Sequence, residues 1–434
     1  MRKFSILYIL CLISFTLHAQ NNEALNYINQ NAIALDTTNA DTGYHDLLAL
    51  KSVLSNRLLV GMGEATHGTH EFQATKFRMF KFLVQEMGYK LFGIEANFTE
   101  CRSVNDYVLY GKGDARTAIG GTYFWTWKTK EMLQMVEWMH SYNINKPDSA
   151  KIKFYGFDME FDRAALKSVT QKLKRFDSVY YFANFNAMVT LKICDTSKTR
   201  YAKFSKEKAD STKQLLADIK VYLDKQNANL LKVFSADEIA YLKHDVRLLE
   251  QCLDFDLEIN KTGYVTMNAE FLRDKFMAEN VEWVLKYEGP KSKMMIWAHN
   301  GHIEKSDMMM GSYLKRAYKD DYYAIGFDFN KGTFRATDMT DHRGVVQFTV
   351  GDAEKGSTSF LFSQLNIPAF FIDIENAVKT GSPAKSFFIK SIKHRSISAG
   401  YSSKWESTQY LSNPLYDCFD GLIFINDTKP TQPM

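Results

Sequence analysis

The sequence predicts an α/β protein: a mostly parallel sheet flanked by helices, with an inserted helical subdomain. Two patterns and the composition support this fold class. Short apolar runs alternate with longer segments of helical periodicity, and one long stretch, residues 161–287, shows helical periodicity without a clear strand. Hydrophobic residues make up 45% of the 434 positions, which is enough to bury a large core.

The predicted strands are short apolar runs between polar or turn-forming residues. Residues 20 to about 50 come first and show the pattern of an amphipathic lead-in helix and loop. Five runs then follow as the main strand candidates: 57–63, 90–95, 153–158, 294–299 and 322–327. Later candidates are 345–350, 369–374 and 421–425. Because helical segments separate them, we expect these strands to pair mostly in parallel.

The helical stretch divides the core into two parts. Residues 20–160 form the first part of the α/β core, residues 161–287 the helical insertion, and residues 288–434 the second part. The insertion leaves and re-enters the core next to Asp158 and His299. We therefore expect it to form one wall of a substrate cleft, because a large apolar substrate needs apolar walls.

The first 19 residues have the pattern of a signal peptide. Arg2 and Lys3 precede a short apolar run, and Ala19 provides a small residue at the cleavage site. We expect an exported protein, periplasmic or secreted, with no stable membrane insertion after leader removal. An uncleaved anchor remains the alternative, although the apolar run is short for a membrane span.

The overall charge and the cysteines exclude several classes of function. The 54 basic residues nearly balance the 50 acidic ones, so no nucleic-acid partner is implied. After leader removal, the cysteines lie far apart and form no C-x-x-C pair, which argues against a disulfide framework or a cysteine zinc site. We expect a small-molecule substrate and no cofactor.

Titratable side chains gather where four of the predicted strands end. They are Glu64 and His67 after the first strand, Glu95 at the end of the second, Asp158 and Glu160 at the third, and His299 and His302 after the fourth. Ligands of open α/β sheets bind outside the carboxyl ends of the strands, so these groups are expected in one crevice. Each also has a structural interpretation, for example as a helix cap or a loop histidine.

The motifs that are absent favour an activated water as the nucleophile. The sequence has neither a G-x-S-x-G elbow nor a phosphate-binding loop. A histidine held by a carboxylate can take a proton from water, and a second histidine or an arginine can stabilise the oxyanion. Lys76, Arg78 and Arg102 follow on nearby helices as candidates that orient the site, or as solvated charges. Trp125 and Trp127 are candidates for an apolar wall, with core packing as the alternative.

Seven segments together resemble the erythromycin esterase family. They run in order along residues 50–426: Gly63–Phe72, Gly93–Ala96, Trp125–Glu131, Tyr155–Asp158, Arg273–Asn280, Trp297–Ile303 and Phe419–Ile425. The resemblance implies a metal-independent lactone hydrolase that acts on 14-membered macrolides. It also implies that His67 is the general base that activates water.

The resemblance further implies that Glu64 and Glu95 support His67 and that His299 and His302 line the same cleft. One position departs from the family. Members often have arginine where this chain has Lys76, and Arg78 matches a second family arginine. An ammonium lacks the fork of a guanidinium, so the substrate orientation carried over from the family is weakened.

Two alternatives remain open at the level of sequence. His67, His299, His302, Glu64 and Glu95 are ligand types that could instead hold a metal in a metal-dependent hydrolase of another ester or lactone. A non-enzymatic protein could also use the same fold to bind a ligand. The cluster of acid and base groups argues against that alternative, because simple binders need few titratable groups.

Overall fold

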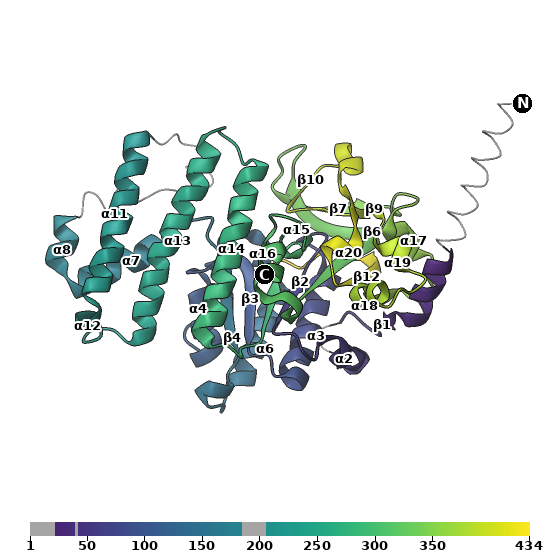
Figure 1. Ribbon diagram of the computed structural model, residues 1–434, viewed down its shortest axis with the longest axis horizontal. Coiled ribbons are helices and arrows are strands. Elements are labelled where there is room, and N and C mark those ends of the chain that lie inside the picture. Colours follow the sequence, from purple (N-terminus) through teal and green to yellow (C-terminus); the bar gives the residue numbers. More distant parts are fainter. Residues whose placement is uncertain (1–21, 40–41, 185–204) are drawn as a thin grey trace, which may run out of the picture.

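The computed structural model describes residues 22–39, 42–184 and 205–434 and contains a ten-stranded sheet with helices on both faces (Figure 1). The strand order is β1-β8-β12-β6-β2-β5-β3-β4, and β7 and β10 also pair with β6. The six strands from β12 to β4 in this order are parallel, whereas β8, β1 and β7 are antiparallel to their neighbours. The predicted fold class is confirmed.

The strands of this sheet lie close to the predicted runs. Their bounds are β1 Ile33–Ala34, β2 Leu59–Met62, β3 Leu91–Asn97, β4 Lys153–Asp158, β5 Met294–Trp297, β6 Tyr322–Asp338, β7 Val345–Val350, β8 Ala369–Asp373, β10 Gly400–Tyr401 and β12 Gly421–Thr428. β6 is much longer than predicted because its second half pairs with β7. A separate two-stranded sheet, β9 (Ser391–Arg395) with β11 (Tyr410–Pro414), was not predicted.

Hydrophobic side chains of the sheet alternate between two cores, one on each face. In β5, Met295 and Trp297 face one core, while Met294 and Ile296 face the other. The first core is covered by α3 (His70–Met87), α4 (Cys101–Tyr110) and α6 (Lys130–Asn143). Successive strand residues point to opposite faces, so a strand of continuous apolar residues requires helices on both sides.

A group of helices, four of them long, follows β4 and covers the second core. Its members are α7 (Arg163–Phe176), α8 (Ser178–Ala183), α11 (Lys206–Lys225), α12 (Asn227–Leu230), α13 (Ala236–Asn260) and α14 (Met267–Glu288). Figure 1 shows α11, α13 and α14 side by side, with α14 nearest the sheet. Ser205, Ser235 and Thr266 cap α11, α13 and α14 by accepting a backbone N–H of the first turn. The described residues from 163 to 288 include no strand.

The remaining elements are short. Residues 22–31 are helical, as the lead-in pattern predicts. The others are η1 His45–Ala49, α2 Leu50–Leu54, α5 Ala115–Gly120, η2 Trp125–Trp127, η3 Asp148–Ala150, α15 Asn300–Ile303, α16 Met310–Tyr318, η4 Lys319–Asp321, α17 Thr358–Ser363, α18 Ile374–Lys379, α19 Lys385–Phe388, η5 Ser403–Thr408 and α20 Leu415–Cys418. The predicted leader, residues 1–19, lies outside the described residues. No helix in the described part of the chain is long and apolar enough to span a bilayer.

Candidate active site

The site lies where the connections from neighbouring parallel strands diverge. β2, β5, β3 and β4 are adjacent, in that order. After β2 the chain enters α3 on one face of the sheet, whereas after β5 it enters α15 and α16 on the other face. This divergence opens a crevice at the carboxyl ends of the strands, the usual ligand position in an open α/β sheet. The polar residues predicted at four strand ends thus come together.

His67 is held in place through Glu64 by a buried cation. The His67 Nδ1 atom lies 2.7 Å from one carboxylate oxygen of Glu64. The other oxygen accepts hydrogen bonds from Lys76 Nζ at 2.6 Å and from the indole N–H of Trp297 at 2.8 Å. The Lys76 ammonium also lies 4.2 Å from the centre of the Trp297 ring. Both oxygens of Glu64 are therefore used, and the His67 ring is fixed.

The charges in this chain of contacts depend on one another. Burial by itself would raise the pKa of Glu64, but Lys76 and His67 outweigh burial and lower this pKa below its usual value. Burial lowers the pKa of Lys76 to about 8, and Glu64 opposes that shift. At neutral pH Glu64 is ionised and Lys76 is mostly protonated.

His299 is a neutral, fully bonded histidine next to His67. The two rings lie 5.2 Å apart between centroids. Its Nδ1 accepts the backbone N–H of Gly301 at 3.2 Å, so its proton is on Nε2, which donates to the Ile397 carbonyl at 3.2 Å. Burial, with the nearby His67 and His302, lowers the pKa of His299 to about 3. No N–H of this ring is left for a ligand.

His302 carries a positive charge between two carboxylates. Its Nδ1 lies 3.0 Å from Asp274 and its Nε2 lies 3.3 Å from Glu95. Burial would lower the pKa of His302, but Asp274 and Glu95 outweigh burial and hold this pKa well above its usual value. Imidazolium is therefore the stable form at neutral pH.

Arg273 on α14 joins the carboxylates of two strands. It bonds Asp158 at the end of β4 at 2.7 Å and Glu95 on β3 at 3.0 Å, and it contacts Glu160 at 3.1 Å and Glu270 at 3.4 Å. Glu95 also accepts the backbone N–H of His299 at 2.9 Å, which ties β3 to the turn after β5. Burial would raise the pKa of Glu95, but His302 and Arg273 keep this carboxyl ionised.

These groups open onto a cavity of about 340 Å³. Its lining residues are His67, Glu95, Phe124, Thr126, Glu160, Met267, Glu270, Arg273, Asp274, His299, Gly301, His302, Met309, Ser398 and Ala399. α14 therefore supplies one side, as expected for the helical region. The lining holds four carboxylates against the cations Arg273 and His302, so its formal charge is −2 when His67 and His299 are neutral. Met267, which is 64% exposed, adds an apolar rim.

Several side chains predicted to contact substrate do not line this cavity. Lys76 lies behind Glu64, and Asp158 lies behind Arg273. Arg78 bonds Asp46 and the carbonyls of Thr37 and Gly43. Arg102 forms a two-bond pair with Asp245. Each cation instead satisfies a nearby buried acceptor, which holds it away from the cavity.

The two tryptophans also lie outside the cavity lining. Trp127 is buried and donates its indole N–H to the Glu95 carbonyl at 2.9 Å. Trp125 is half-buried, with the Arg335 guanidinium 5.5 Å from its ring centre. Core packing was the alternative interpretation for both tryptophans, and it is the one that fits the buried Trp127. The side chains on this wall are Phe124 and Thr126, which flank Trp125 in the sequence.

Glu160, which was expected with Asp158 at the end of the third strand, lines the cavity. Two other contributions were absent from the predicted site. Arg273 and Asp274 lie in one of the segments that carry the family resemblance, so the pattern contained a signal for them. The loop at residues 397–399 gave no signal: it reaches the site because the Ile397 N–H bonds the Ala65 carbonyl at 2.6 Å.

Neither a metal site nor an activated side-chain nucleophile is found among the described residues. No group of three or more His, Cys, Asp or Glu side chains in this part of the chain could hold a metal ion. The hydrogen bonds of the described residues join the His67 ring to Glu64 and to no hydroxyl or thiol. Among the described residues, one ring nitrogen of His67 is therefore left without a hydrogen-bond partner, in a cavity that the His302 imidazolium also lines.

Known proteins share both the sequence pattern and the fold. The family model described as erythromycin esterase matches residues 84–428, a range that includes Glu95, Arg273, His299 and His302 and begins after Glu64 and His67. The protein YbfO of Bacillus subtilis is 27% identical over 371 residues, 80% of each chain. Erythromycin esterase type II of Escherichia coli is 24% identical over 387 residues, 81% of this chain and 88% of that one. A crystal structure of a Bacillus cereus protein has a TM-score of 0.81 at 23% identity, covering 95% of this chain and 99% of that one.

Proposed function

This chain belongs to the erythromycin esterase family, and from that premise we propose that it hydrolyses the lactone ester of a macrolide antibiotic with a water activated by His67. Such a reaction would inactivate the drug and give macrolide resistance. One observation carries the proposal. Lys76 bonds Glu64, Glu64 bonds His67, and His67 lines the cavity.

The hydrogen bond to Glu64 selects the reactive nitrogen of His67. An ionised carboxylate can only accept, so Nδ1 carries the proton and Nε2 keeps its lone pair. Nε2 is then the atom that takes a proton from water. The fixed ring lowers the cost of orienting the base, and Glu64 stabilises the imidazolium that forms.

We assign stabilisation of the oxyanion to His302 rather than to His299. His299 is neutral and its one N–H is bound to Ile397, whereas His302 is an imidazolium that lines the same cavity. A cation next to the reacting carbonyl stabilises the developing negative charge more than a neutral ring does, and the His302 Nε2 atom now lies 3.3 Å from Glu95.

Hydrolysis proceeds by direct attack of water, without a covalent enzyme intermediate. The oxygen of water bonds to the acyl carbon while His67 Nε2 takes one of its protons. The bond from the acyl carbon to the ring oxygen then breaks, and His67 returns the proton to the leaving alkoxide. The product is the open-chain hydroxy acid, heavier than the lactone by one water.

A macrolide panel incubated with the purified protein tests this function. Mass spectrometry should show a gain of one water in at least one 14-membered macrolide. In ¹⁸O-labelled water under single-turnover conditions, the label should enter the product directly. A panel without any product would contradict the macrolide substrate, and a trapped acyl-enzyme would contradict direct attack by water.

We also propose that the protein is exported and that its leader is cleaved after Ala19. The support is the sequence pattern of residues 1–19, which lie outside the described residues. An exported hydrolase would meet the antibiotic before the drug reaches the ribosome. Mass spectrometry of the protein from its native host should show a chain that begins at Gln20. A chain that still carries Met1 would contradict this proposal.

A further inference from the structure

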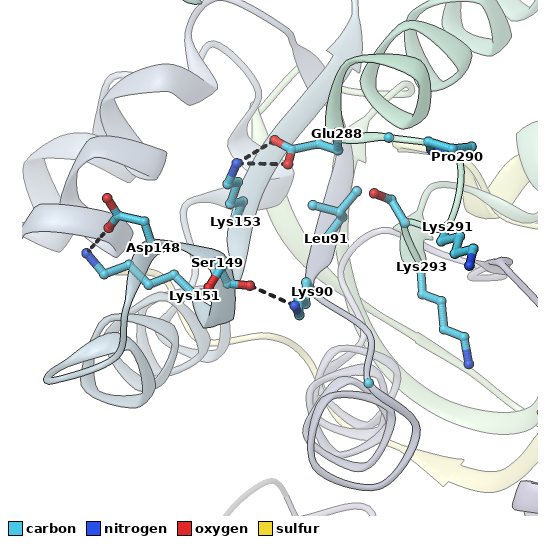
Figure 2. A pocket seen from close by; sticks show the side chains of 13 residues that line it. Lys90, Leu91, Asp148, Ser149, Lys151, Lys153, Glu288, Pro290, Lys291 and Lys293 are labelled. Carbon is cyan, nitrogen blue, oxygen red and sulfur yellow. Dashed lines mark hydrogen bonds and ion pairs between the residues drawn. The ribbon is translucent and has the colours of Figure 1, made fainter.

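A second cavity lies at the opposite, amino-terminal end of the sheet and is lined by lysines (Figure 2). Its volume is about 530 Å³, larger than that of the candidate active site. The five lysines of its lining are Lys90, Lys151, Lys153, Lys291 and Lys293, and its two carboxylates are Asp148 and Glu288. No part of the proposed hydrolysis uses these residues.

The starts of three neighbouring strands bring three lysines to one edge of the sheet. Lys153 begins β4, while Lys90 and Lys293 immediately precede β3 and β5. The Lys153 N–H donates to the Lys90 carbonyl at 2.8 Å, and the Lys90 N–H donates to the Lys293 carbonyl at 3.2 Å. Lys90 and Lys293 stand one position before the paired residues Leu91 and Met294, whereas Lys153 pairs with Leu91 and so faces the other side of the sheet. Like charges directly opposite each other on adjacent strands are unfavourable, so an anion beside Lys90 and Lys293 would stabilise this edge.

The carboxylates compensate only two of the five charges. Both oxygens of Glu288 bond Lys153 at 2.8 Å, and Asp148 bonds Lys151 at 2.8 Å. Figure 2 shows these two pairs on one side of the cavity and Lys291 and Lys293 on the other.

The remaining three ammonium groups have no acidic partner in the part of the chain that the structure describes. Lys90 donates to the Ser149 carbonyl at 2.7 Å, Lys293 donates to the Met87 carbonyl at 3.1 Å, and Lys291 has no bonded partner among the described residues. Five lysines against two carboxylates leave a formal charge of +3 on the lining. Each ammonium has three N–H donors, so the carbonyl contacts leave donors for a ligand.

We propose that this lysine pocket binds a small molecule that carries a diphosphate or triphosphate group. The volume lies within the usual range for small-molecule sites, about 300–1,000 Å³. Lysine ammonium groups bind phosphate oxygens as point charges, and the lining offers five of them. Three uncompensated cations match a ligand with several adjacent negative charges better than a monoanion.

Titration calorimetry at low ionic strength with phosphate, pyrophosphate and tripolyphosphate tests the pocket. The affinity should rise along this series and fall with added salt. The double variant Lys90→Gln/Lys293→Gln should bind pyrophosphate about tenfold more weakly, as expected for two charge contacts that solvent screens in part. Pyrophosphate should also raise the melting temperature of the wild type more than that of the variant.

A charge-matched control separates this pocket from a general effect of net charge. Lys355→Gln/Lys404→Gln removes two exposed lysines elsewhere and should leave pyrophosphate binding unchanged. Equal binding by the wild type and the pocket variant would overturn the proposal, and so would an equal loss in the control. Citrate binding as tight as that of tripolyphosphate would overturn the phosphate assignment. None of these readouts depends on hydrolysis.

Discussion

The two ends of the same sheet hold their charges in different ways. At the carboxyl end, Arg273 is 8% exposed and contacts four carboxylates from three segments of the chain. At the amino end, Lys151 pairs with an Asp148 side chain that is 84% exposed, and Lys153 is 29% exposed. One end therefore has a buried network in which every carboxylate is paired, and the other has two separate pairs, one with an exposed carboxylate and one partly buried.

Burial decides what each arrangement can contribute. An ion pair in water adds little stability, because solvent screens it and the long side chains lose freedom. A buried network is costly to form and more costly to break, so it fixes the positions of its members. The carboxyl end is suited to hold a base and a cation in fixed geometry, whereas the amino end leaves lysines free to meet a ligand.

The sharpest test of this comparison removes the proposed base. His67→Gln should lower lactone hydrolysis by about 10²–10⁴-fold, the usual contribution of a general base. Circular dichroism should show an unchanged fold, because glutamine can still donate to Glu64. The exposed His45 provides the matched control, and His45→Gln should retain full activity. A folded His67→Gln protein with near-normal activity would refute the role assigned to this histidine.

A second pair of variants compares how much the ion pairs at each end of the sheet contribute to the free energy of unfolding. Arg273→Met leaves several buried carboxylates without their cation, so the free energy of unfolding should fall by about 3–5 kcal/mol. Lys151→Met removes the partner of Asp148, whose side chain is 84% exposed at the amino end, and should leave the free energy of unfolding nearly unchanged. Urea unfolding measures both values. Equal losses would mean that burial does not distinguish the two ends.

The pKa of Lys76 predicts an alkaline limit to activity. As the pH rises through about 8, Lys76 loses its proton and Glu64 loses its cation, so hydrolysis should fall. Between this value and the usual 10.5, the unfolded chain binds more protons than the folded one, so the contribution of Lys76 to stability should rise with pH. Above about pH 8, the hydrolysis rate should therefore fall while the contribution of Lys76 to the free energy of unfolding rises.

The variant Lys76→Arg should extend activity to higher pH, because a guanidinium does not titrate in this range. The pH profile of the hydrolysis rate measures the effect in both proteins. An alkaline limb at the same pH in the variant would assign that limb to another group.

The smallest effect concerns the acidic lining of the active-site cavity. An ester of choline should be hydrolysed about twofold to fivefold faster than the ester of its uncharged isostere 3,3-dimethylbutanol, because the lining carries a formal charge of −2. Glu270→Gln, at the mouth of the cavity, should reduce this preference. If both esters react equally, the lining charge does not select the substrate; if neither reacts, the pair does not test the preference.

The sequence predicted the strands and the residues that end them because both signals are local. Each main strand is a continuous apolar run, and the polar residue that follows it is visible at once. The side of a helix that faces the site is not visible in this way. Lys76 and Arg78 are two positions apart on α3, about 200° around the helix, so only one of them can reach Glu64.

Contacts between distant segments account for what the sequence could not provide. Arg273 reaches Glu95 across 178 positions, and Ile397 reaches His299 across 98. Neither pairing follows from spacing or periodicity. The same limit applies to the lysine pocket, since Lys90, Lys153 and Lys293 become neighbours only through the strand order β4-β3-β5.

The sequence by itself determined the fold class, the family and the set of acid and base groups at the strand ends. These depend on apolar periodicity and on short motifs, which act within a few residues. Only the tertiary structure decided which histidine is charged and which is neutral. Protonation depends on the carboxylates, carbonyls and buried surface that folding brings around each ring, and here those come from α14 and the loop at Ile397.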